Sequence, residues 1–247
     1  MLGLLVRVGI DQTYGGWNAP CRDDRSFCYV PIPIQQEELF DQGFETTYHE
    51  FEQDCQNFAQ ENVFPRRLQN AQSHLDPDFR FLSYGDTDRK ARQIYAFFEN
   101  SSDNFIAFYA SFKQIGHEPR PLVYAIIGLY RFREVRFARD VPLNQREKNA
   151  HTRLAGYQNP NNADIVIFAD PRTRRSGRLR SLIQIGEQHD NHHYYVRNQL
   201  LRQWGGISSR NGWIQRSASL PHFCNPDLFL QWFEDQNSQL VHENNIL

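Results

Sequence analysis

The sequence lacks the motifs by which several large enzyme classes are recognised. It contains no P-loop and no Gly-x-Gly-x-x-Gly turn after a predicted strand, the two common cradles for nucleotide phosphates. It also contains neither the Gly-x-Ser-x-Gly turn of α/β-hydrolases nor the paired His-x-Glu and Pro-Cys-x-x-Cys motifs of zinc deaminases. These absences argue against the standard nucleotide-cofactor enzymes and against the zinc deaminases.

Cysteines and long apolar segments are also scarce. The four cysteines form no Cys-x-x-Cys pair, so we expect free thiols in a reducing cytoplasm. No apolar run approaches the roughly 20 residues of a membrane helix, and no signal peptide is recognisable before the apolar segment that begins at residue 2. We therefore expect a cytoplasmic protein without membrane contact, and the sequence predicts neither a metal site nor a cofactor.

The chain has no excess of positive charge. Its 27 Lys and Arg residues are balanced by 29 Asp and Glu residues, for a net charge of −2. Charge alone therefore does not predict tight, non-specific binding to duplex DNA. The charge is unevenly placed, however, since residues 35–61 are acidic and residues 172–180 are rich in arginine.

Aromatic residues are abundant, with 19 Phe, 11 Tyr and 4 Trp, and rigid rings suit the core of a β-sheet. Apolar runs and alternation predict strands at 2–10, 27–34, 104–112, 122–132, 164–168 and 182–185. Helical spacing predicts helices at 35–64, 88–100, 193–204 and 227–233. We expect one α+β domain over residues 1–247, with a mostly antiparallel sheet for which a barrel-like arrangement is one possibility.

The first candidate site follows the N-terminal strand. Asp11 is followed by Tyr14, by the pair Gly15-Gly16 and by Trp17. Glycines let a backbone approach a ligand closely, and an aromatic ring can stack on a base. The alternative is a tight turn in which Asp11 binds its own backbone.

The second candidate is the run His74-Leu75-Asp76-Pro77-Asp78. Side chains alternate along extended backbone, so residues 74, 76 and 78 are expected on one side. One imidazole and two carboxylates can transfer protons or hold a divalent cation. The alternative is a solvated turn capped by Asp76 and Asp78.

Further candidates lie in the second half of the chain. His151 precedes a predicted strand and is either a substrate contact or a hydrogen-bonded structural residue. Arg172, Arg174 and Arg175 follow that strand and are candidate phosphate contacts, with an exposed loop as the alternative. Arg216 lies in a turn that nothing intrinsic marks as functional.

Three stretches resemble, in order, the motifs of a known family. They are residues 9–16 followed by Pro31-Ile32-Pro33, residues 73–78, and the run Arg-Ser-Ala-Ser-Leu-Pro at 216–221. The family is the third type of nucleotide-modification-associated domain, described as DNA base hypermodification proteins of phages and mobile elements. The resemblance implies functional roles for Asp11, Gly15, Gly16, His74, Asp76, Asp78 and Arg216. Residues 84–90 depart from the glycine- and alanine-rich stretch expected after the second motif.

A second resemblance concerns residues 103–110 and 124–130, which are similar to the core hairpin of PUA-like and EVE-like barrels. Those modules read modified bases in a pocket lined by aromatic rings. Both resemblances point to a partner that carries a modified base, either DNA or a nucleotide. The sequence leaves the oligomeric state open.

Three hypotheses follow: an enzyme, a non-catalytic reader of modified bases, and a structural or partner-binding protein. As an enzyme of the transferase or glycosylase type, the chain would use Asp11, Asp76 and Asp78 together with His74 as the proton shuttle. The substrate contacts would be Tyr14, Gly15, Gly16, Trp17, His151, Arg172, Arg174, Arg175 and Arg216. As a non-catalytic reader, it would bind the modified base in the same pocket.

Overall fold

A long hairpin forms the centre of the fold. The computed structural model describes residues 1–34, 39–60, 63–98, 103–117, 122–172, 175–189, 193–215 and 219–245. Strands β6 (Phe105–Gln114) and β7 (Leu122–Phe137) pair in antiparallel register from Phe105↔Arg131 to Lys113↔Leu122. The hairpin predicted from the two apolar runs is confirmed, and β7 extends five residues beyond its predicted end at residue 132.

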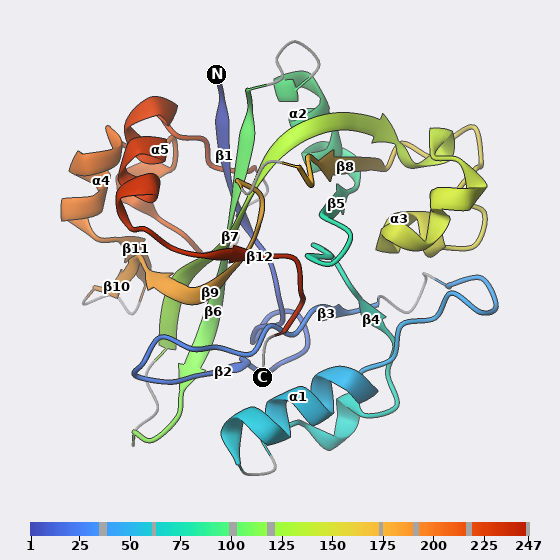
Figure 1. The fold of residues 1–247 in the computed structure, drawn as a ribbon, viewed down its shortest axis with the longest axis horizontal. Helices are drawn as coiled ribbons and strands as arrows, with labels where there is room; N and C mark the ends of the chain where they lie inside the picture. The colour runs from blue at the N-terminus through green and yellow to red at the C-terminus, as the bar shows by residue number, and fades with distance from the viewer. Residues whose placement is uncertain are drawn as a thin grey trace.

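Further strands extend this hairpin on both sides. β1 (Gly3–Arg7) and β2 (Pro20–Cys21) run parallel to β6. The far end of β7 pairs antiparallel with β8 (Ile165–Ala169), which in turn pairs with β5 (Ser83–Asp86). Over the described residues the strand order β1-β6-β7-β8-β5 has two ends, so the sheet is open rather than a closed barrel (Figure 1). The predicted α+β class with a mostly antiparallel sheet is confirmed.

The N-terminal half of β7 pairs with a strand from the C-terminal part of the chain. There β9 (Gly177–Gln184) pairs with β7 and with β12 (Leu240–Val241), in both cases antiparallel. β10 (Gly186–Gln188) and β11 (Tyr194–Val196) form a separate two-stranded ribbon. The helix predicted over 193–204 is therefore wrong in its first half, because the aromatic and β-branched residues of β11 pair with β10.

Both faces of the central sheet are buried. Along β6, Ile106 and Phe108 belong to one apolar core, whereas Phe105 and Ala107 belong to another. This assignment follows from the alternation of side chains along a strand. A strand that is covered on both faces reads as a continuous apolar run, which explains why the sequence shows no polar alternation here.

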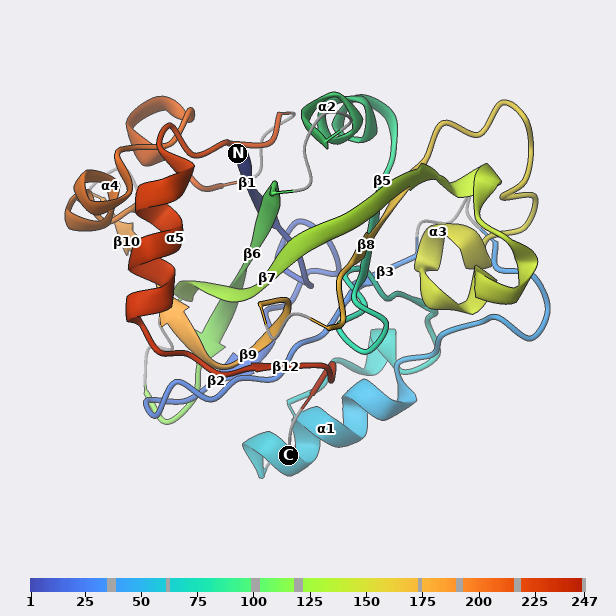
Figure 2. The same cartoon turned by 45° about the horizontal axis from the view of Figure 1, so that its top comes forward.

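Helices cover the two cores separately. α4 (Asn198–Trp204) and α5 (Pro226–Asp235) lie together on one side of the hairpin, away from the other helices (Figures 1 and 2). α1 (His49–Ala59) and α2 (Asp88–Phe98) contribute buried side chains to the other core. The helix predicted over 35–64 is confirmed only as α1, since residues 39–48 are not helical and residues 35–38 and 61–62 lie outside the described ranges.

Short elements bring two sequence motifs side by side. β3 (Ile32–Pro33) pairs antiparallel with β4 (Ser73–His74), and Ile32 lies opposite His74. α3 (Ala150–Arg153) is a single turn of helix after a 3₁₀ segment at Leu143–Lys148. Further 3₁₀ turns are at Arg66–Leu68, Ala138–Asp140 and Arg210–Gly212. Within the described ranges, every helix is too short or too polar to traverse a bilayer.

Candidate functional site

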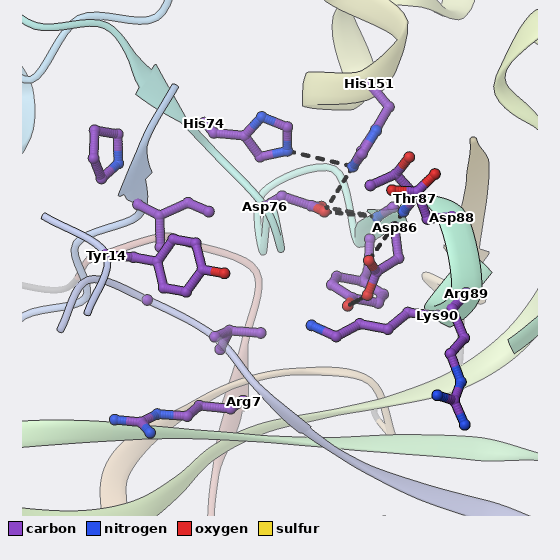
Figure 3. Close-up of a pocket in the computed structure, with 16 residues that line it drawn as sticks. Arg7, Tyr14, His74, Asp76, Asp86, Thr87, Asp88, Arg89, Lys90 and His151 are labelled. Carbon is purple, nitrogen blue, oxygen red and sulfur yellow. Dashed lines mark hydrogen bonds and ion pairs between the residues drawn. The ribbon is translucent and has the colours of Figure 1, made fainter. Parts of the chain in front are cut away.

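A cavity of about 360 Å³ lies where β1, the β3–β4 pair, β5 and α3 meet. Its volume falls in the range of small-molecule sites. Figure 3 shows its lining, with His74, Asp76 and His151 on one side and Tyr14 and Lys90 reaching toward the same space. The full lining is Arg7, Val8, Gly9, Tyr14, Ile32, Pro33, His74, Asp76, Tyr84, Gly85, Asp86, Thr87, Asp88, Arg89, Lys90 and His151.

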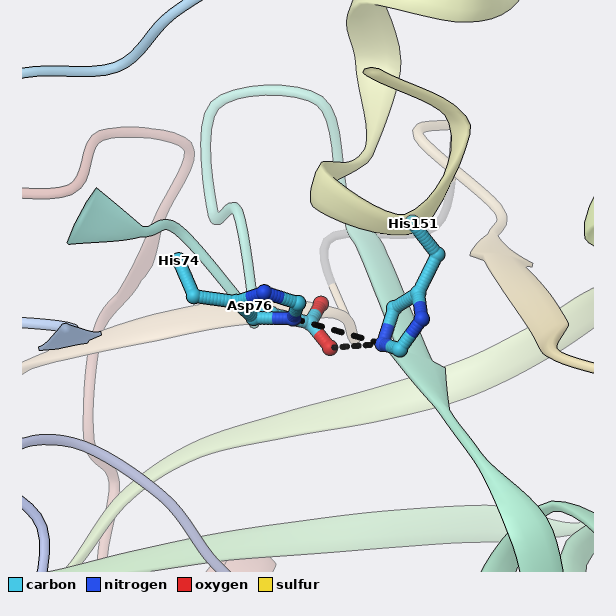
Figure 4. A group of neighbouring side chains, drawn as sticks. All are labelled: His74, Asp76 and His151. Atoms are coloured by element: carbon cyan, nitrogen blue, oxygen red, sulfur yellow. Dashed lines mark hydrogen bonds and ion pairs between the residues drawn. The ribbon is translucent and has the colours of Figure 1, made fainter. Parts of the chain in front are cut away.

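Three of these side chains converge at one point, and we call them the His–Asp–His group: His74, Asp76 and His151. The Nε2 atoms of the two histidines lie 3.3 Å apart, and Nε2 of His151 lies 3.7 Å from Oδ2 of Asp76 (Figure 4). All three residues are buried, with exposed fractions of 4 to 8 %. They come from the end of β4 and from α3, which are 77 residues apart in sequence.

Backbone and side-chain donors hold the carboxylate of Asp76. The N–H of Gly85 lies 3.0 and 2.9 Å from its two oxygens, and Nδ2 of Asn149 donates to Oδ1 at 3.0 Å. Burial raises the pKa of Asp76 to about 8, although the charge of His151 and these hydrogen bonds act in the opposite direction. Because the donors fix both oxygens, the carboxylate keeps one orientation toward the cavity.

A second carboxylate orients His151. Oδ2 of Asp164, which directly precedes β8, lies 2.9 Å from Nδ1 of His151. Burial alone would lower the pKa of His151, but the hydrogen bond to Asp164 and the charges of Asp76 and Asp164 raise it to about 9. An ionised carboxylate only accepts hydrogen bonds, so Nδ1 is the donor and Nε2 faces the rest of the group.

The His–Asp–His group can offer three ligand atoms to one cation. One ring nitrogen from each histidine and one oxygen of Asp76 all lie within 4.8 Å of one another. Imidazole nitrogen and carboxylate oxygen are common ligands of divalent transition metals. The same atoms can also exchange protons with a substrate in the cavity.

Asp78 does not join this group, although the sequence analysis expected it on the same side as His74 and Asp76. β4 ends at His74, so the alternation of extended backbone does not continue to residue 78. Oδ1 of Asp78 accepts hydrogen bonds from the backbone N–H groups of Arg80 and Phe81, and Oδ2 lies 3.3 Å from the guanidinium of Arg153. The carboxylate of Asp78 therefore caps a turn, but the residue is buried rather than in the solvated turn of the alternative interpretation. A catalytic role for Asp78 stays a prediction.

Asp11 also caps its own turn. Its Oδ1 accepts hydrogen bonds from the backbone N–H groups of Thr13 at 2.7 Å and Tyr14 at 2.8 Å, while Oδ2 forms an ion pair with Arg7 at 3.1 Å. The turn places Tyr14, but not Asp11, in the lining of the cavity. Asp11 thus holds the turn that carries Tyr14.

The glycine pair and Trp17 lie beside the cavity lining. The carbonyl groups of Gly15 and Gly16 accept hydrogen bonds from Arg67 at 2.6 and 2.8 Å. A Cβ atom at Gly15, whose φ is +95°, would lie 2.5 Å from Ile10, so close packing explains this glycine. Trp17 packs edge-on against Phe64, with ring centroids 5.4 Å apart.

The predicted arginine contacts are not part of the lining. Arg172 is exposed and bonds to Asp170, and Arg175 borders a different cavity together with Arg131. Arg174 and Arg216 lie outside the described residues. Contact of these arginines with phosphates stays a prediction.

No motif in the sequence marked the residues that support the His–Asp–His group. Gly85 and Asn149 hold the carboxylate of Asp76, and Asp164 holds the ring of His151. Asn149 reaches Asp76 across 73 residues of sequence. One signal was present: residues 84–90, which depart from the family pattern, all line the cavity.

We expect a Gly85→Ala substitution to displace His151. The added Cβ atom would lie 2.3 Å from Cδ2 of His151, and overpacking of this kind costs about 1–3 kcal/mol. Urea unfolding measures the destabilisation, and NMR of the imidazole protons reports the displacement. Gly116→Ala is the control for the imidazole spectra, because its Cβ atom would meet nothing within 4 Å. Its φ of +82° strains an alanine at that position, so the two variants are compared by their spectra and not by their free energy of unfolding. Identical imidazole spectra for both variants would contradict the expected displacement.

A family model described as nucleotide modification associated domain 3 matches residues 3–224. Searches of curated proteins and of solved structures returned no significant match. The matched range includes every residue of the His–Asp–His group.

Proposed function

The chain belongs to the family described as nucleotide modification associated domain 3, and from that premise we propose that it is an enzyme that acts on a base of DNA, or on the corresponding nucleotide. The reaction takes place in the cavity beside the His–Asp–His group. The substrate class is the one predicted from the sequence. The proposed catalytic residues are His74, Asp76 and His151, in place of the predicted Asp11, His74, Asp76 and Asp78.

The observation that carries the proposal is the burial of two imidazoles and a carboxylate at the wall of a cavity that can hold a base. Buried ionisable groups with strongly shifted pKa values cluster at functional sites. Asp76 and His151 both have raised pKa values, and both face the cavity. A reader that only binds a base has no need for such a group, since aromatic walls and neutral hydrogen-bond partners suffice.

The remaining lining suits a nucleotide. Tyr14 offers an aromatic face for a base, and Lys90 and Arg89 offer positive charge for a phosphate at the first turn of α2. In Figure 3 the ring of Tyr14 and the amine of Lys90 lie on the side of the cavity opposite His74. A base stacked on Tyr14 would thus present its edge or its glycosidic bond to the His–Asp–His group. A base in a duplex would have to be flipped out to reach it.

Tyr14→Ala is expected to weaken binding of the substrate nucleotide by about 1–3 kcal/mol, because a stacking surface of that value is removed. Tyr14→Phe keeps the ring and is expected to bind as the wild type does. Isothermal titration with the nucleotide measures both affinities. Equal affinity of the alanine and phenylalanine variants would remove Tyr14 from the proposed base contact.

The test of the proposed function is mass spectrometry of nucleosides and released bases. The purified protein is incubated with hypermodified phage DNA, with unmodified DNA and with the free nucleotides. A new or missing base supports an enzyme, and its mass identifies a transferase or a glycosylase reaction. Unchanged DNA that is nevertheless retained selectively on the protein when it is modified would replace the proposal by the reader hypothesis.

A further inference from the structure

We propose that the His–Asp–His group binds a divalent transition-metal ion, with Nε2 of His74, Nε2 of His151 and a carboxylate oxygen of Asp76 as its ligands. The sequence alone predicts no metal site in this chain, because the two histidines are 77 residues apart in sequence. A catalytic use of the ion rests on the proposed function, but binding of the ion does not, because it can be measured without any substrate.

The spacing of the ligand atoms fits one ion. With zinc–nitrogen distances of about 2.0–2.1 Å, two nitrogens of a tetrahedral site lie about 3.3–3.4 Å apart. The two Nε2 atoms are 3.3 Å apart. The carboxylate oxygen lies 3.7 Å from Nε2 of His151, and all three ligand atoms fall within 4.8 Å of one another, so a small inward shift of the side chains would bring the set to the spacing of ligands around one ion.

The surrounding contacts are those of a metal site. A histidine ligand usually donates its other ring N–H to a carboxylate, which fixes the tautomer and directs the lone pair at the metal. Asp164 makes this contact with Nδ1 of His151 at 2.9 Å. The second ligand, Asp76, is held in turn by Gly85 and Asn149. Ligands and supporting residues therefore form one connected network.

The ligand chemistry selects the class of ion. Calcium and magnesium prefer sites built from oxygen atoms, whereas two imidazoles and one carboxylate suit ions such as Fe²⁺, Co²⁺ and Zn²⁺. Three protein ligands leave at least one coordination position for water or substrate, as in catalytic rather than structural metal sites. All three ligands border the cavity, so that position would face a bound base.

A metal-free interpretation of the same contacts exists, in which the two imidazoles share a proton across the 3.3 Å between their Nε2 atoms. The two interpretations differ in what the protein retains after treatment with a metal ion. The full chain is stripped with a chelator, incubated with Zn²⁺ or Co²⁺, and freed of excess ion by dialysis. Bound metal is measured by elemental mass spectrometry, and the Co²⁺ form also by its visible absorption spectrum.

We expect one ion per chain in the wild type and a Co²⁺ spectrum typical of mixed nitrogen and oxygen ligands. His151→Ala and the milder Asp76→Asn should lose the ion, while His49→Ala, on the exposed face of α1, should retain it. Asp164→Asn should weaken binding by about 10- to 100-fold, because it removes the orienting carboxylate. Circular dichroism verifies that each variant is folded.

A wild-type protein that retains neither Zn²⁺ nor Co²⁺ would overturn the inference, and so would binding that survives both ligand substitutions in folded protein. These outcomes are separable from failure of the proposed function. A metal-free protein that converts a base would refute the metal site alone. A protein that binds the ion at these residues but converts no base would keep the metal site and refute the proposed reaction.

Discussion

Replacing His74 with alanine is expected to lower the rate of base conversion by at least about 100-fold, the lower end of what a positioned proton-transfer group contributes. His74 is buried, lines the cavity and lies 3.3 Å from His151. Its loss removes one of the two imidazoles from the reaction centre, and this holds whether the imidazole transfers a proton or binds an ion. The rate is followed by mass spectrometry of the nucleosides.

The matched control for this variant is His49→Ala, which removes an exposed imidazole from α1. It should convert the base at the wild-type rate. Thermal unfolding of both variants separates loss of chemistry from loss of structure. A folded His74→Ala protein that works at full rate would exclude the His–Asp–His group as the reaction centre.

The largest effect on stability is expected for Phe108→Ala, which should lower the free energy of unfolding by about 3–5 kcal/mol. Phe108 lies in the middle of β6 and is fully buried. Its ring centroid is 4.8 Å from that of Tyr130, 5.2 Å from Tyr84 and 5.9 Å from Phe79. Removing the ring leaves a cavity among rigid aromatic neighbours, which cannot collapse to fill it.

Urea denaturation at constant pH measures this loss. Phe81→Ala serves as the control, because the same side chain is removed at a partly exposed position. The control should be affected much less than Phe108→Ala. Equal destabilisation of the two variants would mean that the aromatic cluster around β6 is not the main apolar core.

How much of this fold the sequence predicts depends on the range of the interactions. The β6–β7 hairpin was predicted because each strand is an apolar run and the segment between them holds Gly116, Pro119 and Pro121. β11 was misassigned because its three residues fit either state, and only pairing with β10 decides between them. The non-helical part of 35–64 likewise had no local signal strong enough to separate it from α1.

Long-range contacts also limit how much of the candidate site can be predicted from the sequence. His74 and Asp76 are close in sequence, so their pairing was predictable from the residue types. His151 contacts His74 across 77 residues of sequence. Asp164 contacts His151 from the start of β8, a strand that the sequence predicts without showing which elements lie beside it. For Asp11 and Asp78 both a catalytic and a capping role were open, and the backbone N–H groups two and three residues downstream bind both carboxylates locally.

The position of α2 has a consequence for how such a protein can diversify. Its Ala91, Ile94 and Phe98 anchor the helix in the core, while Asp88–Lys90 on its first turn border the cavity. Mutations in this turn would therefore change one wall of the cavity, while the buried anchors of the helix and the His–Asp–His group keep their residues. If the proposed function holds, related proteins could in this way differ in the bases they accept while they share one reaction centre.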